Sequence, residues 1–270
     1  MTPPPPRVIA AFAPGAKPQL LPGGQGSAFR AGDVVLKPVS FAAEAEWTAA
    51  VLQGLSCDQF RVPSPVQAPD GAIVVDGWAA WTFLAGEPAG PNGGRWEETL
   101  YACHALHDAL KGIPRPEFLD ARTDPWAIAD RMAFDESQLR CSAAVREVLE
   151  PLLAAIRPVA LPSQVIHGDF TANVVFAEGL PPGIIDFTPY WRPALFAAAV
   201  VAIDAFSWAG VDESRAIHFS DDPSFPQMFA RAALRRLLEF DQHLRLGNAR
   251  VADLPGHARA IETATRLLFR

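Results

Sequence analysis

The alternation of hydrophobic and polar residues divides the chain into a strand-rich first third and a helical remainder. Residues 19–39 hold two or three short apolar segments separated by the turn sequences PGGQGS and RAGD, and residues 72–88 hold two more around Asp76-Gly77. Short apolar segments bounded by glycine, proline and aspartate predict antiparallel strands joined by tight turns. Residues 41–55 space their apolar side chains at helical steps instead, which predicts one helix among these strands.

From residue 95 onward, apolar side chains recur every three or four positions, as they do on the buried face of a helix. Residues 194–206 are apolar except for Asp204, but they are shorter than the ~20 residues that span a bilayer, so we expect a buried helix. Residues 165–187 interrupt the helices with a strand, a loop and a second strand. The pattern predicts helices over residues 95–110, 124–140, 143–156, 194–206, 226–246 and 256–268.

A glycine- and proline-rich segment, AGEPAGPNGG, separates the two parts of the chain. We therefore expect an N-terminal arm and first strand region over residues 1–18, a β-rich lobe over 19–85 and a helical lobe over 86–270. The first seven residues include four consecutive prolines, which favour an extended, loosely held conformation.

The composition excludes several classes of protein. The net charge is −7, whereas a nucleic-acid-binding protein normally carries a basic patch and a high isoelectric point. Three scattered cysteines without a CxxC spacing suit a reducing compartment and provide no metal-binding framework. The apolar segment near the N-terminus is too short for a signal peptide. We expect a cytoplasmic protein that binds neither nucleic acid nor membrane; the sequence leaves its oligomeric state open.

Polar residues gather at the ends of two apolar segments in residues 165–187. The first segment ends in His167-Gly168-Asp169, Asn173 follows, and the second segment, GII, ends at Asp186. Two carboxylates and an amide at strand ends indicate a functional site. The simpler interpretation is a hairpin whose Asp and Asn side chains form Asx turns.

A β-rich lobe, a Gly/Pro-rich joint and a helical lobe with HGD, Asn and IDF resemble the aminoglycoside phosphotransferase and choline kinase family of the protein-kinase-like fold. The resemblance covers roughly residues 19–270 and is strongest at 165–187. It implies an α+β fold with a small β-rich N-lobe and a larger, mainly helical C-lobe. It also implies transfer of a phosphoryl group from ATP, with Mg²⁺, to a hydroxyl of a small molecule.

The resemblance also implies roles for individual residues in the helical lobe. Asp169 would orient the substrate hydroxyl and accept its proton, while Asn173 and Asp186 would hold Mg²⁺, which prefers oxygen ligands. His167 would brace the loop by hydrogen bonds.

In the β-rich lobe the resemblance implies a nucleotide site. Lys37 shares a strand face with Val35 and Val39 and would meet the α- and β-phosphates, paired with Glu44 or, as we prefer, Glu46. The backbone around Thr82–Leu84 would bracket adenine. The turn residues that would approach the phosphates are Gly24, Gly26 and Ser27.

Two departures from the family pattern leave the activity open. Asn173 follows Asp169 one position earlier than the equivalent Asn in protein kinases, and Arg192-Pro193 replaces an acidic segment of the family. Arg192 would then pair with Asp169 or Asp186, Tyr190 and Trp191 would line the substrate pocket, or catalysis would be lost. The last outcome would make the chain a nucleotide-binding, pseudokinase-like regulatory protein.

The acceptor is the least defined part of the prediction. Acidic residues in 124–140 and 204–222, together with three tryptophans, suit a cationic hydroxyl compound such as an amino sugar, an aminoglycoside or an amino alcohol. An ordinary solvated acidic surface is an equal alternative. The residues concerned are Asp130, Asp135, Glu136, Asp204, Asp212, Glu213, Asp221, Asp222, Trp126, Trp191 and Trp208.

Overall fold

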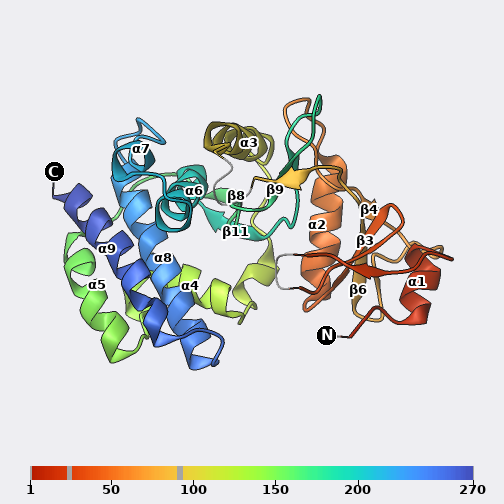
Figure 1. Ribbon diagram of the computed structural model, residues 1–270, viewed down its shortest axis with the longest axis horizontal. Coiled ribbons are helices and arrows are strands. Elements are labelled where there is room, and N and C mark those ends of the chain that lie inside the picture. The colour runs from red at the N-terminus through yellow and green to blue at the C-terminus, as the bar shows by residue number, and fades with distance from the viewer. Residues whose placement is uncertain (1, 23–25, 90–93, 270) are drawn as a thin grey trace. The chain divides into compact units, whose positions relative to one another are not determined.

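The computed structural model describes residues 2–22, 26–89 and 94–269 (Figure 1). The chain forms two compact units. The first unit comprises Met1–Pro88 and Asn173–Phe187, and the second comprises Ala89–Ala172 and Thr188–Arg270. The first boundary lies within three residues of the predicted one at 85/86. The segment 173–187, which the sequence analysis placed in the helical lobe, belongs by its contacts to the first unit.

The first unit contains the strands that the hydrophobic pattern predicts. Its described strands from the N-terminal part form one antiparallel sheet in the order β1-β2-β3-β6-β4, with β5 paired to β6 (Figure 1). The hairpin of β5 and β6 turns at Asp76 and Gly77, both with positive φ, as an Asp-Gly turn requires. The elements are α1 (Pro6–Phe12), β1 (Gln19–Leu20), β2 (Phe29–Ala31), β3 (Val34–Pro38), α2 (Ala42–Gly54), β4 (Pro65–Val66), β5 (Val74–Val75), β6 (Trp78–Thr82) and β7 (Glu87–Pro88).

The N-terminal arm is helical where the sequence analysis expected an extended segment. Pro6 is the first residue of α1, a position that tolerates proline because its missing N–H would have no helical partner there. The helix buries Val8 and Phe12 against Phe29 and Leu36 of the sheet. The prediction of a loose arm was wrong because the apolar residues after the prolines form part of the core.

A second sheet explains why residues 173–187 belong to the first unit. In it β9 (Val174–Phe176) pairs with both β7 and β10 (Gly183–Ile184). Arg61 strengthens this connection, since its backbone bonds to Pro182 and Ile184 and its side chain donates to the Pro181 carbonyl. The pairing of β7 with β9 and the contacts of Arg61 join segments more than 80 residues apart in sequence, which no local pattern reveals.

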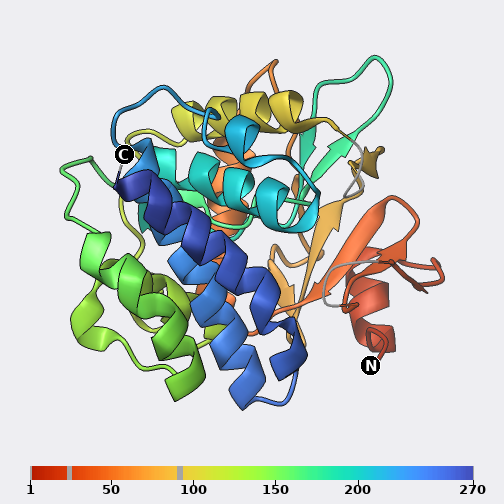
Figure 2. The ribbon, with the colours of Figure 1, turned by 60° about the vertical axis from the view of Figure 1, so that its left-hand side comes forward.

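The second unit is helical and is built around α8, which packs against α4, α6 and α9 (Figures 1 and 2). One short two-stranded sheet, β8 with β11, lies within its described part. The predicted helix over 124–140 ends at Phe134, because Asp135 is extended and its carboxylate accepts from Ser137 and Gln138. The elements are α3 (Trp96–Ala109), η1 (Glu117–Asp120), α4 (Pro125–Phe134), η2 (Glu136–Gln138), α5 (Ala143–Ala155), β8 (Gln164–His167), β11 (Pro189–Arg192), α6 (Ala194–Trp208), α7 (Glu213–Ala216), α8 (Phe225–Arg245), η3 (Val251–Asp253) and α9 (Leu254–Leu268).

Helix α6 lies at the centre of the core of this unit, as its apolar sequence predicts. Its residues from Phe196 to Phe206 are buried, Asp204 included. Along the described chain, none of the helices combines the length and apolar character that crossing a lipid bilayer would require. The predicted α+β class is confirmed, with most strands in one unit and most helices in the other.

Candidate active site

The loop that carries Asp169 follows β8 and is fixed at its base by β11. In this ladder His167 is paired with Pro189, and the Gly168 N–H donates to the Thr188 carbonyl at 3.0 Å. Val165 and Ile166 are fully buried. A buried strand with paired backbone therefore holds the first residues of the loop in place.

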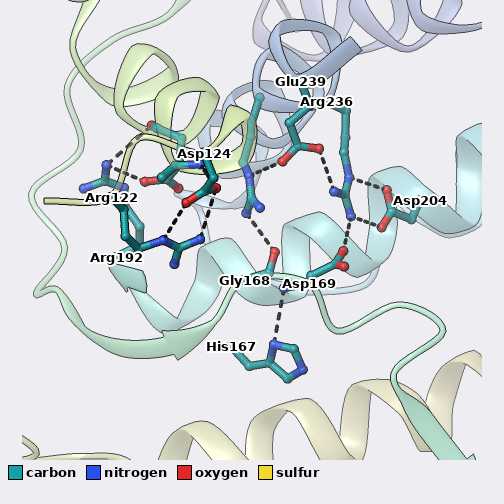
Figure 3. Close-up of polar contacts among 12 residues, drawn as sticks. Arg122, Asp124, His167, Gly168, Asp169, Arg192, Asp204, Arg236 and Glu239 are labelled. Carbon is teal, nitrogen blue, oxygen red and sulfur yellow. Dashed lines mark hydrogen bonds and ion pairs between the residues drawn. The ribbon is translucent and has the colours of Figure 1, made fainter. Parts of the chain in front are cut away.

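His167 is fully buried and acts on the backbone of the loop. Its Nδ1 accepts hydrogen bonds from the N–H groups of Asp169, at 3.4 Å, and Thr188, at 3.3 Å (Figure 3). An Nδ1 that accepts requires the proton to reside on Nε2 in the neutral ring. This geometry fits a bracing role for His167.

A second histidine, His107 of α3, supports the first. Its Nε2 accepts from the His167 backbone N–H at 3.1 Å, and its Nδ1 lies 2.6 Å from the Cys103 carbonyl, to which it must donate. Burial lowers the pKa of His107 to about 3, so the ring is neutral at pH 7. His104, one helical turn earlier on α3, is exposed and takes no part in this arrangement.

Gly168 is required for space. A Cβ at this position would lie 2.2 Å from Cδ2 of Tyr190, well inside van der Waals contact. The Tyr190 ring is buried and lies against the guanidiniums of Arg235, at 4.5 Å, and Arg122, at 4.9 Å. The ring therefore cannot move aside easily, and any side chain at residue 168 would displace the loop.

The Asp169 carboxylate is held in a network of charges (Figure 3). Oδ1 of Asp169 lies 3.0 Å from the guanidinium of Arg236, which also bonds to both oxygens of Asp204 and, at 2.8 Å, to Glu239. Asp204 and Glu239 are 4% and 8% exposed in their side chains, whereas Asp169 is 46% exposed. The network thus anchors a guanidinium in the core and leaves the Asp169 carboxylate accessible.

The charges of the network set the protonation of Asp169. Burial raises the pKa of this carboxyl, but the charge and hydrogen bond of Arg236 lower it more, and the net pKa is below the ordinary value. Burial raises the pKa of Asp204 despite the neighbouring Arg236. Asp169 is therefore an ionised carboxylate at neutral pH and is positioned to accept a hydrogen bond.

Arg235, the neighbour of Arg236 on α8, holds the backbone of the same loop. It is 1% exposed, donates to the Gly168 carbonyl at 2.7 Å and pairs with Glu239 at 2.7 Å. Glu239 consequently uses one oxygen for each arginine. Two successive residues of one helix fix the carbonyl and the carboxylate of two successive residues of the loop.

Arg192 does not take the place that the sequence analysis gave it. Its guanidinium pairs with Asp130 of α4 at 2.7 Å, and the partner of Asp169 in this unit is Arg236. Strand β11 directs Arg192 towards α4, where it lies over Phe134. Tyr190 and Trp191 line a cavity of about 280 Å³ together with Arg192, and Asp169 and Arg236 are not among its lining residues.

In the first unit, Lys37 and Asp186 form an ion pair with a distance of 2.7 Å between Nζ and Oδ1. Their side chains are 28% and 56% exposed. Asp186 has a left-handed backbone with φ of 55°, an unusual conformation that turns the chain immediately after β10. Phe187 stacks on Trp47 of α2, with ring centres 6.5 Å apart.

Asn173 lies beside Asp186 at the end of the same ladder. The Asn173 carbonyl accepts from the Ile185 N–H at 2.9 Å, one residue beyond the pairing of Val174 with Ile184. Ala172, which precedes Asn173, adopts φ of 64°, in the left-handed region that rarely holds an alanine. Ala172 thus adopts a strained backbone in the loop between Asp169 and Asn173, which is one residue shorter than the equivalent loop of protein kinases.

The structure does not pair Lys37 with Glu46. Among the described residues Lys37 pairs with Asp186, and Glu46 is exposed on the side of α2 that carries Ala50 and Gln53. Glu44 is half-buried, on the face that carries Thr48. Helical periodicity would have preferred Glu44, since the buried positions of α2 are Thr48, Ala49 and Leu52.

The other predicted nucleotide residues lie in the first unit. Gly24 is outside the described residues, Gly26 has φ of 63°, and Ser27 precedes β2. The Thr82 N–H donates to the Ser64 carbonyl. Within the part of the chain that the structure describes, the N–H of Leu84 has no hydrogen-bond partner and remains available as a donor.

Comparison with known proteins decides the family. A model of the phosphotransferase enzyme family matches residues 20–191, more than half of the chain. The chain belongs to this family. No curated protein gives a significant match.

Solved structures share the fold of this phosphotransferase family member at low identity. A choline/ethanolamine kinase family protein from Mesorhizobium loti is 18% identical, with a TM-score of 0.63 and 97% of each chain covered. A thermostable mutant of aminoglycoside phosphotransferase APH(4)-Ia, in ternary complex with AMP-PNP and hygromycin B, is 16% identical with a TM-score of 0.58, covering 97% of this chain and 96% of that one. An ethanolamine kinase from Plasmodium vivax is 12% identical with a TM-score of 0.58, covering 96% and 85%. The predicted family and protein-kinase-like fold are confirmed, and the matches support a small-molecule phosphotransferase.

Sequence reasoning missed the residues of this phosphotransferase that hold Asp169. Arg235, Arg236 and Glu239 are spaced as on the solvated face of a helix, where Arg and Glu three or four positions apart form exposed pairs. The sequence contains one indication of this network: Asp204 is a carboxylate inside an apolar helix, and a buried carboxylate needs a cation beside it. The arginine that would supply it follows only from the packing of α6 against α8.

Proposed function

We propose that the protein is an ATP- and Mg²⁺-dependent phosphotransferase that acts on a hydroxyl of a small molecule, with Asp169 as the catalytic base. The observation that carries this proposal is the half-exposed, ionised Asp169 on a loop whose backbone and charge are fixed by His167, Arg235 and Arg236. An accessible carboxylate held in this way suits orientation of a hydroxyl and capture of its proton.

The donor atoms of the first unit fit magnesium and nucleotide. The backbones of Asn173 and Asp186 lie at the same end of one ladder, so their amide and carboxylate oxygens would serve as magnesium ligands, since Mg²⁺ is held in such enzymes by one or two protein oxygens together with phosphates. Lys37 lies in contact with Asp186 and would bind phosphate oxygens. When bound, the ion would neutralise charge on the phosphates of ATP.

Nucleotide recognition would use the backbone of the first unit. The available N–H of Leu84 would donate to adenine, and Gly26 and Ser27 would approach the phosphates. Glu44, on the half-buried face of α2, is our revised candidate for the acidic partner of Lys37 when the nucleotide is bound. ATP and the three free cysteines of the described chain both suit the cytoplasm.

In the reaction the substrate oxygen would form a bond to the γ-phosphorus while the bond between that phosphorus and the bridging oxygen of ADP breaks. Asp169 would take the hydroxyl proton, and the neutralised carboxyl would release it to solvent after the product leaves. Arg236 keeps Asp169 ionised before the transfer and fixes the direction of its carboxylate.

The test compares wild type with Asp169→Asn in an assay of ADP release with a library of hydroxyl compounds. We expect turnover to fall about 10²- to 10⁴-fold, the contribution of a general base, and Mg-ATP binding to persist in a thermal-shift measurement. Asp108→Asn, at an exposed position of α3 in the second unit, is the matched control and should keep full turnover.

Two results would overturn the proposal. If Mg-ATP fails to bind the wild type, the chain is not a kinase of this kind. If Mg-ATP binds but no compound is phosphorylated and slow ATP hydrolysis is equal in wild type and Asp169→Asn, the alternative of a nucleotide-binding regulatory protein holds.

A further inference from the structure

The second unit contains a cavity of about 400 Å³ beside the network that holds Asp169. Arg236 lines this cavity and contacts the Asp169 carboxylate at 3.0 Å, so a molecule bound there would lie next to the base. The volume is at the lower end of the roughly 300–1,000 Å³ typical of small-molecule sites. The lining residues are Trp126, Thr171, Asp204, Trp208, Arg236, Glu239, Phe240, His243, Asn248, Ala249 and His257.

The carboxylates of this cavity are already neutralised. Both oxygens of Asp204 bond to Arg236, and the two oxygens of Glu239 bond to Arg235 and Arg236. Two guanidiniums therefore face three carboxylates, counting Asp169, and a single negative charge remains next to the reaction centre. An ammonium group in the cavity would meet Arg236 and could gain Asp204 or Glu239 only by breaking a buried pair.

Several of the acidic residues of 124–140 and 204–222, which the sequence suggested as acceptor ligands, also have partners within the protein. Asp130 pairs with Arg192, and Glu213 pairs with Arg266. Asp212 accepts from the Arg215 N–H at the start of α7, and Asp222 accepts from the Ser224 N–H. These four acids thus bond within the protein itself, which weakens the argument for a cationic acceptor.

Aromatic rings form most of the remaining wall. Trp126 contacts His243 with ring centres 5.0 Å apart, and His257 lies 4.9 Å from Trp208 and 4.7 Å from Phe240. Burial and the charge of Arg236 lower the pKa of His257 to about 4, so this ring is neutral at pH 7. Aromatic faces with a few neutral hydrogen-bonding groups are the lining of a pocket for an uncharged ligand.

We propose that this cavity binds the acceptor and that the acceptor is an uncharged, polyhydroxylated single ring of the sugar or cyclitol class. The C–H face of such a ring packs on Trp126 or Trp208, while its hydroxyls bond to Asn248, Thr171 and Asp169. This inference rests on the proposed function. It replaces the cationic amino sugar, aminoglycoside or amino alcohol that the sequence suggested.

The experiment measures kcat/KM with Mg-ATP for neutral compounds (glucose, galactose and myo-inositol) and for cationic ones (hygromycin B, choline and ethanolamine). We expect the best neutral compound to exceed the best cationic one by at least about tenfold, which corresponds to ~1.4 kcal/mol. Trp126→Ala should raise KM for that compound more than it lowers kcat. Trp96→Ala, on α3 and outside the cavity, is the matched control and should change neither.

Direct calorimetric binding to Asp169→Asn separates this inference from the proposed function. Tighter binding or faster phosphorylation of a cationic compound would overturn the acceptor class and leave the phosphotransferase activity standing, and so would binding of neither group. Binding of a neutral compound that Trp126→Ala abolishes, without any phosphorylation by the wild type, would support the acceptor class and contradict the proposed function.

Discussion

The two sets of candidate site residues are built on opposite principles. In the second unit, Asp169 depends on buried guanidiniums and carboxylates that are paired with one another and with the backbone of the loop. In the first unit, Lys37 and Asp186 form an ion pair whose two side chains are 28% and 56% exposed. A base must keep one direction and one charge throughout the reaction, whereas residues that bind nucleotide and metal must exchange partners. The comparison indicates that the side chain of Asp169 is held more rigidly than those of Lys37 and Asp186.

Removing one charge from each set should show this difference most strongly. Glu239→Gln leaves Arg235 buried without a full counter-charge and should lower the free energy of unfolding by about 3–5 kcal/mol. Lys37→Gln breaks a solvent-exposed pair and should lower it by less than ~1 kcal/mol. Urea unfolding of the two variants beside wild type measures both values; equal losses would refute the distinction.

Changing the contact surface of the loop should have the next largest effect. Gly168→Ala places a methyl group against the Tyr190 ring, and we expect a loss of about 1–3 kcal/mol in unfolding free energy together with reduced turnover. Tyr190→Ala in the same chain should restore part of the turnover by making room. Gly256→Ala on α9, where a Cβ would meet only an ordinary contact with Trp208 at 3.8 Å, should be neutral or slightly stabilising.

The smallest expected effect concerns the neutral histidine beneath the loop. Below pH 6.5 the unfolded chain protonates His107 while the folded protein does not until about pH 3, so stability falls as pH decreases through this range. One such group contributes up to ~1.4 kcal/mol per pH unit. Unfolding free energies between pH 5.5 and 7.5 should therefore decline less steeply for His107→Gln than for wild type. Parallel profiles would contradict the buried neutral ring; His104→Gln removes an exposed histidine of the same helix as the control.

Local signals predicted much of the fold. The Asp76-Gly77 turn, the strands around Lys37 and the helical spacing of residues 194–206 and 226–246 all correspond to elements of the structure. These elements depend on residues close in sequence, which explains why their prediction succeeded. The motif residues His167, Asp169, Asn173 and Asp186 also stand out locally, because polar groups rarely end apolar strands; their roles stay predictions.

The errors arose where distant segments meet. The chain position of 173–187 suggested the helical lobe, but the pairing of β7 with β9 and the contacts of Arg61 attach it to the first unit. The partner of Asp169 is likewise 67 residues away on α8, on a helix whose charges look solvated in the sequence. Arg192 lies close to the motif in sequence and was therefore the expected partner of Asp169 or Asp186, but its guanidinium pairs with Asp130.

Because Arg235 and Arg236 lie on α8, the part of the chain that identifies the family does not contain the residues that hold Asp169. The region that identifies the family ends at residue 191, and Asp204, both arginines and Glu239 all follow it. A truncated gene product containing residues 20–191 would keep every signature residue and would lose Arg235 and Arg236, the two guanidiniums that lower the pKa of Asp169. A search by signature would still retrieve such a fragment, although it would lack the guanidinium that fixes the direction of the Asp169 carboxylate.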